Sequence, residues 1–323
     1  FFRCTTLHGT VALDDALEMS FITFFFTLGG MIDVDIINRW ATAVGLGELS
    51  GIDLPHEVQG VIPSRVWKLE HMGEPWYPGE TISVSIGQGA VSVTPISLAV
   101  MMSAVANGGM RVVPHLLKAT RTDGEWITAG SPEPTSVGLK PETVETIHRG
   151  LWMAVNRQGT GGRGRLPQWD VIGKTGTAQV ISLEGRESAK GTGQDFRDHG
   201  WFVFAAPREI PKIAGVVFAE HSEHGYLAAP IAKHIMETFF AKQEGLPFPM
   251  LPATPPPVLP AVVAGGISQA LLTTAFGLIV AMIIQIFQNF FVSMIDKLIL
   301  DMEENSVKFM DQLHLEYEKL AKS

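Results

Sequence analysis

The chain has 323 residues, which allows one large domain or two smaller ones and is enough to bury a substantial core. Only 18% of the residues are charged and the formal net charge is −9, which excludes a mainly disordered chain and disfavours nucleic acid as the main partner. The single cysteine, Cys4, excludes an internal disulfide framework and any metal site built from several cysteines. Because the sequence starts at Phe1 without a signal peptide, we expect it to be a piece of a longer or processed protein.

Helical and strand-like patterns both occur in the first 245 residues. Apolar residues at helical spacing predict four helices, over Ala12–Leu28, Ile96–Asn107, Pro141–Val155 and Pro230–Phe240. Runs of β-forming residues between turn signals predict three strands, over Val171–Ile181, Trp201–Ala206 and Ile213–Ala219. Since the strands do not alternate strictly with helices, the pattern predicts an α+β domain with an antiparallel sheet.

The string Lys174-Thr175-Gly176-Thr177 lies at the start of the first predicted strand and allows two interpretations. The first is a phosphate-binding loop, but Gln168 stands where that pattern needs its first glycine, and such a loop leads into a helix rather than a strand. The second is the Lys-Thr-Gly strand beside an acyl-serine site. There the lysine supplies positive potential for a substrate carboxylate, the threonine hydroxyl hydrogen-bonds it, and the glycine leaves room for the substrate backbone. The N–H of Thr177 would then point at a developing oxyanion.

Other segments accompany this motif in a specific order. They are HGTVALDDALEMS (8–20), GLGELSGIDLPHEVQGVIPS (45–64), PGETISVSIGQGAVSVTPISLAVMMSAVANGG (78–109), RDHGWFVFAAP (197–207) and EHSEHGYLAAPIAKHI (220–235). In this order and spacing, residues 1 to about 245 closely resemble the transpeptidase domain of the penicillin-binding protein 2 family, the cell-wall enzymes of rod-shape elongation. The resemblance implies a beta-lactamase/transpeptidase-like fold, an antiparallel sheet flanked by helices. It also implies an active-site-serine D,D-transpeptidase that acts on peptidoglycan stem peptides and is trapped by beta-lactams.

The resemblance assigns roles to two groups of residues. Lys174, Thr175 and Gly176 match the family's third motif, and Ser20 matches the serine of its second motif, which helps to shuttle the leaving-group proton. The family's nucleophile motif, Ser-x-x-Lys, is absent, because no serine in the sequence has a lysine three residues later. We therefore expect the chain to be inactive as given.

The second motif departs from the family pattern as well. Ile22 replaces the polar third residue, Phe21 occupies the middle position, and Phe26 stands where a tyrosine is common. Some family members bind zinc through two Asp, a His and the Cys of this motif. His8 matches that histidine, but Phe2 and Phe21 replace two other ligands, so we expect no metal and no cofactor.

The composition changes after residue 245. From Gly245 to Ile295 there is no Asp, Glu, Lys or Arg. The proline-rich residues 246–260 predict a semi-rigid linker. The apolar residues 261–292 predict a membrane helix, since the uncharged run is longer than a buried core helix requires. Charges return after Asp296 with apolar positions at helical spacing, so we predict that an amphipathic helix completes a third segment, 261–323.

This third segment resembles a second family. AVVAGGISQALLTTAFGLIVA (261–281) and the following FQNFFVSMIDKLILDMEE are similar to the last transmembrane helix of the MotA/TolQ/ExbB proton-channel proteins and its cytoplasmic extension. The resemblance implies that Thr274 faces a proton path beside a partner's aspartate. The alternative is that its hydroxyl only bonds the preceding helical turn. One helix cannot conduct alone, so a channel would need further helices and a TolR- or ExbD-like partner.

Three hypotheses follow for the whole chain. The first is the C-terminal part of a peptidoglycan D,D-transpeptidase in the bacterial inner membrane, with its domain in the periplasm and with rod-shape elongation proteins as partners. The second is a non-catalytic membrane protein joined to a proton-channel helix, as a gene fusion or as two joined fragments. The third is a beta-lactamase or beta-lactam sensor, which the blocks at 45–64 and 78–109 disfavour because they resemble the elongation transpeptidases.

Overall fold

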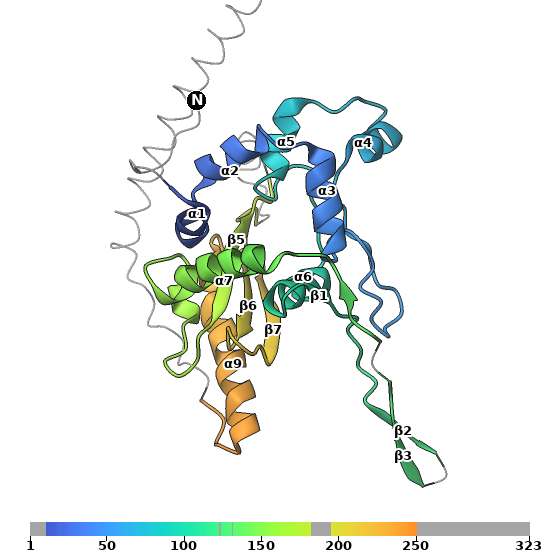
Figure 1. The fold of residues 1–323 in the computed structure, drawn as a ribbon, viewed down its shortest axis with the longest axis vertical. Helices are drawn as coiled ribbons and strands as arrows, with labels where there is room; N and C mark the ends of the chain where they lie inside the picture. The colour runs from blue at the N-terminus through green and yellow to red at the C-terminus, as the bar shows by residue number, and fades with distance from the viewer. Residues whose placement is uncertain (1–10, 123, 131, 182–194, 251–323) are drawn as a thin grey trace, which may run out of the picture. The chain divides into compact units, whose positions relative to one another are not determined.

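The computed structural model describes residues 11–122, 124–130, 132–181 and 195–250 (Figure 1). Residues 246–250 of the predicted linker are described and form no helix or strand, whereas 251–260, the predicted membrane helix and the amphipathic tail lie outside these residues, as do Thr274 and His8. Within the described ranges, no helix is long and apolar enough to cross a membrane.

A three-stranded antiparallel sheet forms the centre of the domain. Its strands are β5 (Ile172–Ala178), β6 (His199–Ala206) and β7 (Ile213–Ala219), in the order β5-β6-β7. All three were predicted from the sequence, and the antiparallel pairing confirms the expected α+β class. Among the described residues, β5 pairs with a strand on one side only. Its other edge is therefore open to pairing with a further chain.

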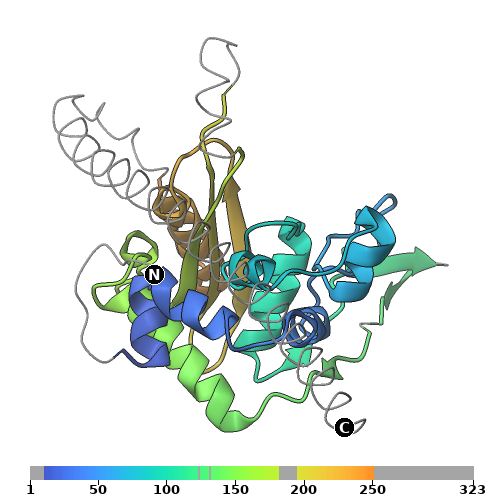
Figure 2. The same ribbon diagram turned by 90° about the horizontal axis from the view of Figure 1, so that it is seen from above.

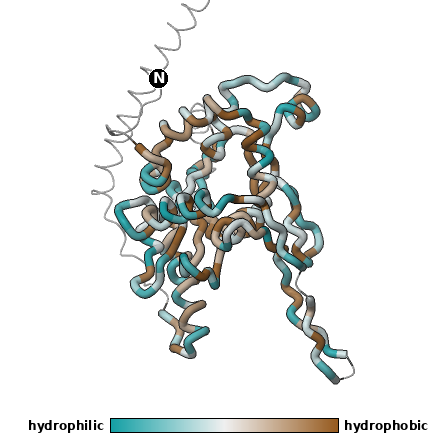
Figure 3. The backbone as a smooth tube through the Cα atoms, in the orientation of Figure 1, coloured by the Kyte–Doolittle hydropathy of each residue, from teal (hydrophilic) through white to brown (hydrophobic). Residues whose placement is uncertain are grey.

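Helices cover both faces of this sheet (Figures 1 and 2). Phe202 and Phe204 of β6 pack toward α9 (Ala229–Glu244), while Ala205 packs with α6 (Pro95–Ala106) and α7 (Pro141–Asn156). Successive strand residues alternate between the faces, so one apolar run supplies two cores. Figure 3 accordingly shows hydrophobic segments gathered in the central part of the domain.

The first predicted helix is wrong in one respect. The structure has two helices in place of one over Ala12–Leu28, namely α1 (Leu13–Met19) and α2 (Ile22–Gly29). Ser20 separates them with a left-handed backbone, φ 56° and ψ 49°, and its N–H bonds the carbonyl of Ala16. A left-handed residue ends a helix, so the chain turns at the serine that the second motif singles out.

The remaining elements are shorter helices, turns and strand pairs outside this core. The helices not predicted from the sequence are α3 (Val34–Ala43), α4 (Arg65–Met72) and α5 (Pro78–Val84), with the 3-10 turns η1 (Gly162–Gly164) and η2 (Gly225–Leu227). Two small antiparallel pairs join β1 (Met110–Arg111) to β4 (Thr135–Ser136) and β2 (Ala119–Thr122) to β3 (Glu125–Thr128). The β2–β3 hairpin projects away from the rest of the domain (Figure 1).

An ion pair ties α1 to α7. Arg149 Nε donates to Asp14 Oδ2 at 2.7 Å, and this hydrogen bond lowers the pKa of Asp14 below its ordinary 3.8. The pair therefore stabilises the fold above about pH 4 and loses its effect as the pH falls through the lowered pKa of Asp14. We expect Arg149→Met to cost about 0.5 kcal/mol at pH 7, because half of the arginine side chain is exposed, and to cost almost nothing near pH 2. Urea unfolding at both pH values measures this, and an equal loss at both would contradict an electrostatic origin.

Candidate active site

Strand β5 carries the Lys-Thr-Gly motif along the open edge of the sheet. In the register of β5 with β6, Lys174 lies opposite Val203 and Thr175 lies opposite Phe202. Opposite residues of an antiparallel pair share a face. Lys174 is therefore on the α6 and α7 face, and Thr175 is on the α9 face. The two side chains approach the open edge from opposite sides of the sheet.

Ser20 lies beside the lysine. Lys174 Nζ donates to Ser20 Oγ and also to the carbonyl of Thr175 at 3.1 Å. The left-handed turn after α1 places the serine there, and the ion pair of Asp14 and Arg149 fastens α1 to α7. The structure thus brings together three of the predicted site residues, although Ser20 and Lys174 are far apart in the chain.

The environment of Lys174 alters its acidity. Burial lowers the pKa of its ammonium group from 10.5 to about 8. The group is still mainly protonated at pH 7, yet it gives up a proton more readily than a surface lysine does. An amine that exchanges protons near neutral pH suits a site that moves protons.

Thr177 is exposed at the same edge and is held from two sides. Its Oγ1 accepts from the N–H of Gly225 in η2 at 3.3 Å, and its carbonyl accepts from Gln88 Nε2 at 3.0 Å. These contacts set the end of the strand where the sequence predicts an oxyanion donor. The role of the Thr177 N–H as a donor to the oxyanion stays a prediction.

Gly176 is not required by packing. A Cβ built at this position would meet only the Cβ of Trp201, at 3.5 Å, which is an ordinary contact. The space beside the strand is thus left free at the open edge. This agrees with a glycine that makes room for an extended peptide rather than for the protein's own side chains.

Sequence reasoning missed two residues that contact these groups, and a third, Glu18, that contacts the segment carrying Thr160. Thr160 Oγ1 lies 2.6 Å from Thr175 Oγ1, Gln88 bonds Thr177, and Glu18 Oε1 accepts from the N–H of Gln158 at 3.2 Å. The glycine-rich run around Thr160 was the only sequence signal for the first of them.

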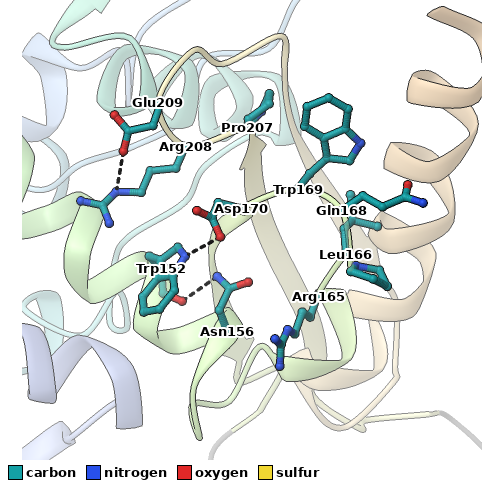
Figure 4. Close-up of a pocket in the computed structure, with 11 residues that line it drawn as sticks. Trp152, Asn156, Arg165, Leu166, Gln168, Trp169, Asp170, Pro207, Arg208 and Glu209 are labelled. Atoms are coloured by element: carbon teal, nitrogen blue, oxygen red, sulfur yellow. Dashed lines mark hydrogen bonds and ion pairs between the residues drawn. The ribbon is translucent and has the colours of Figure 1, made fainter. Parts of the chain in front are cut away.

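A separate cavity of about 370 Å³ opens near the start of β5 (Figure 4). Several of its polar groups hydrogen-bond to neighbouring residues of the domain. Trp152 Nε1 donates to Asp170 Oδ1 at 3.0 Å, and Asn156 Nδ2 donates to the carbonyls of Trp152 and Val171 at 2.8 and 2.7 Å. None of Ser20 and Lys174–Thr177 lines this cavity, so it is distinct from the motif. In the part of the chain that the structure describes, no group of three His, Cys, Asp or Glu could hold a metal ion.

Comparison with known proteins decides the family. The model of the penicillin binding protein transpeptidase domain matches residues 3–237. The chain belongs to the penicillin-binding protein transpeptidase family. The peptidoglycan D,D-transpeptidase MrdA of Acinetobacter baumannii is 38% identical over 236 residues, covering 72% of this chain and 35% of that protein. MrdA of Escherichia coli is 31% identical, covering 71% and 37%. The chain thus spans little more than a third of these relatives.

Solved structures agree with this family. Pseudomonas aeruginosa PBP2 in complex with WCK 5153 has a TM-score of 0.63 and 32% identity, covering 74% of this chain and 49% of that one. PBP2 of Helicobacter pylori in complex with MreC has a TM-score of 0.61 and 26% identity, covering 74% and 41%. The transpeptidase fold expected from the sequence is confirmed.

A second family model matches the other end of the chain. The MotA/TolQ/ExbB proton channel family matches residues 253–304, as the resemblance of the tail implied. This match lies in the part of the chain outside the described residues, beyond the penicillin-binding transpeptidase domain.

Proposed function

We propose that residues 1–245 are the C-terminal part of the catalytic domain of a peptidoglycan D,D-transpeptidase. The observation that carries the proposal is the cluster of Ser20, Lys174 and Thr175 at the open edge of β5. An edge strand can pair with an extended stem peptide, and the ammonium and hydroxyl groups beside it suit the terminal carboxylate of that peptide.

In this reaction a serine Oγ attacks the carbonyl of the penultimate D-Ala. The Oγ–C bond forms while the O–H bond of the serine and the C–N bond to the terminal D-Ala break, and the proton that the serine releases is balanced by the proton that the leaving amine takes up. Ser20, polarised by Lys174, is placed to deliver that proton. The amine of a neighbouring stem peptide then takes the acyl group, and the serine recovers its proton. Lys174 and Thr175 bind the carboxylate, and the N–H of Thr177 stabilises the oxyanion.

The attacking serine is the part that this sequence does not supply. No serine has a lysine three residues later, so the chain of 323 residues by itself forms no acyl-enzyme in our proposal. Fluorescent penicillin tests this. We expect no covalent label on this chain and stoichiometric label on a longer version that carries Ser-x-x-Lys before residue 1. Labelling of the chain as given would overturn its inactivity, and an unlabelled longer version would overturn the assignment.

The proposal includes a location and partners. The transpeptidase relatives and the match to the proton-channel family support the bacterial inner membrane, with this domain in the periplasm. The complex of H. pylori PBP2 with MreC supports a rod-shape elongation protein as partner. Beta-lactams are the expected inhibitors.

A second candidate rests on the match at residues 253–304. The chain would be a non-catalytic membrane protein in which a domain that binds peptidoglycan is joined to a proton-channel helix carrying Thr274. Co-purification with a TolR- or ExbD-like protein would support it, and absence from the membrane fraction would exclude it. Long sequencing reads across the codons for 246–260 distinguish the two origins of such a chain. Reads that continue through these codons show a true gene fusion, and reads that break there show two joined fragments.

A further inference from the structure

A hydroxyl group that the family motifs do not include lies between two groups that they do. Thr160 Oγ1 is 2.6 Å from Thr175 Oγ1 and 3.5 Å from Ser20 Oγ. The first distance is a short hydrogen bond and the second a looser contact. Together they connect the two faces of β5 around its open edge, from Lys174 through Ser20 and Thr160 to Thr175.

The segment that carries Thr160 is packed in place. The N–H of Gly161 donates to the carbonyl of Ala154 at the end of α7, at 2.8 Å. A Cβ built on Gly161 would come within 3.1 Å of the Phe202 ring, so the backbone lies directly on the core. On the other side, Glu18 of α1 accepts from the N–H of Gln158. Contacts to α1, α7 and β6 therefore hold the hydroxyl of Thr160 at this point.

The lysine gives this row of groups a direction. An ammonium group has donors only, so Ser20 Oγ accepts from Lys174 and its own proton is free to point toward Thr160. Either hydroxyl of the Thr160–Thr175 pair can donate, and the row that starts at Lys174 favours Thr160 as the donor, because a hydroxyl that accepts from Ser20 still has its own proton to give. Thr175 then has its proton left for a group outside the protein, and each donor in the row strengthens the next.

We propose that Thr160 is a positioning residue that turns the hydroxyl of Thr175 outward as a donor to a ligand carboxylate. This rests on the proposed function for the identity of the ligand, a peptide ending in D-Ala. Without the donor from Thr160, the Thr175 hydroxyl can rotate and present its lone pairs, which repel a carboxylate.

The test compares Thr160→Val, which removes the hydroxyl at nearly constant shape, with Thr160→Ser, which keeps it. N-acetyl-D-Ala-D-Ala, its C-terminal amide and acetate are titrated against the full chain by saturation-transfer NMR. We expect Thr160→Val to weaken the binding of N-acetyl-D-Ala-D-Ala and of acetate about fivefold, which is the effect of one lost hydrogen bond. Binding of the amide should be unchanged. Thr160→Ser should restore the preference for the acid. Thr146→Val is the matched control, because that hydroxyl only bonds the carbonyl of Glu142 in α7.

The outcomes separate the inference from the function on which it rests. If acetate binds in the predicted order and the dipeptide does not bind, the ligand assignment fails and the role of Thr160 stands. If Thr160→Val keeps the wild-type preference for acid over amide, the role of Thr160 is overturned and the assignment stands. If neither carboxylate binds the wild-type chain, both are overturned. An equal loss for acid and amide would show a merely structural role and would also overturn the inference.

Discussion

Lys174→Met is expected to stabilise the domain at pH 7 while it removes the affinity for carboxylate ligands. The ammonium group of Lys174 is charged at pH 7 in both the folded and the unfolded chain, but only in the folded chain is it partly withdrawn from solvent. The difference between a pKa of 10.5 and one of about 8 corresponds to about 3 kcal/mol of unfavourable free energy. Methionine has a similar shape without the charge, and it gives up the bonds to Ser20 and to the carbonyl of Thr175. We expect a net gain of about 2 kcal/mol.

The pH dependence identifies the cause. Between about pH 8 and pH 10.5 the unfolded chain binds more protons at Lys174 than the folded chain does, so wild-type stability contributed by this group rises with pH in that window. Below about pH 8 the lysine is protonated in both states and its full cost is present. Lys174→Met should remove this rise, so the two proteins should approach each other in stability as the pH increases.

Urea unfolding of the full chain measures the effect. All seven tryptophans lie before residue 246, so their fluorescence reports on the transpeptidase domain alone. Lys212→Met is the matched control, because Lys212 is exposed. This substitution should change the free energy of unfolding by less than about 0.5 kcal/mol at any pH. A loss of stability in Lys174→Met would mean that its hydrogen bonds outweigh its burial. Unchanged binding of N-acetyl-D-Ala-D-Ala would remove Lys174 from the proposed site.

The sequence predicted the central sheet well because its strands are short apolar runs between clear turns. It predicted α6, α7 and α9 for a similar reason, since each has apolar residues at helical spacing and a proline in its first turn. The break at Ser20 was missed, because the residues on both sides continue the helical pattern and nothing local requires a left-handed serine. The position of that serine depends on contacts of α1 with α7, which only the fold supplies.

The site divides in the same way. Ser20, Lys174 and Thr175 could be selected because they belong to motifs with a known chemistry. Thr160 and Gln88 could not, because their roles come from contacts across the fold. Gln88 reaches the carbonyl of Thr177 from a loop 89 residues earlier in the chain. A threonine among glycines has no distinctive pattern until the segment is packed against α7 and Phe202.

Phe202→Ala is expected to have the largest effect on stability of any single change considered. The side chain is fully buried between the sheet and α9, and its ring lies beneath Gly161 in the segment that carries Thr160. Removing a buried phenylalanine side chain costs about 4 kcal/mol, from lost transfer free energy and from the cavity left behind. Thr175 is directly opposite in the register, so the loss also affects the strand that carries the motif.

Three variants separate packing from site geometry. Phe202→Leu fills most of the space and should cost about 1 kcal/mol. Phe218→Ala on β7 is the matched control, because that ring is 39% exposed and mainly contacts Trp201 and His199, so its loss should cost about 1 kcal/mol. We expect Phe202→Leu, although folded, to lose part of the preference for acid over amide, since the support beneath Gly161 changes shape. Phe202→Leu could instead keep the full preference for acid over amide while Thr160→Val loses it. In that case the contacts with α1 and α7 alone hold Thr160 in place. The core beneath this segment would then contribute to stability without fixing the geometry of the site.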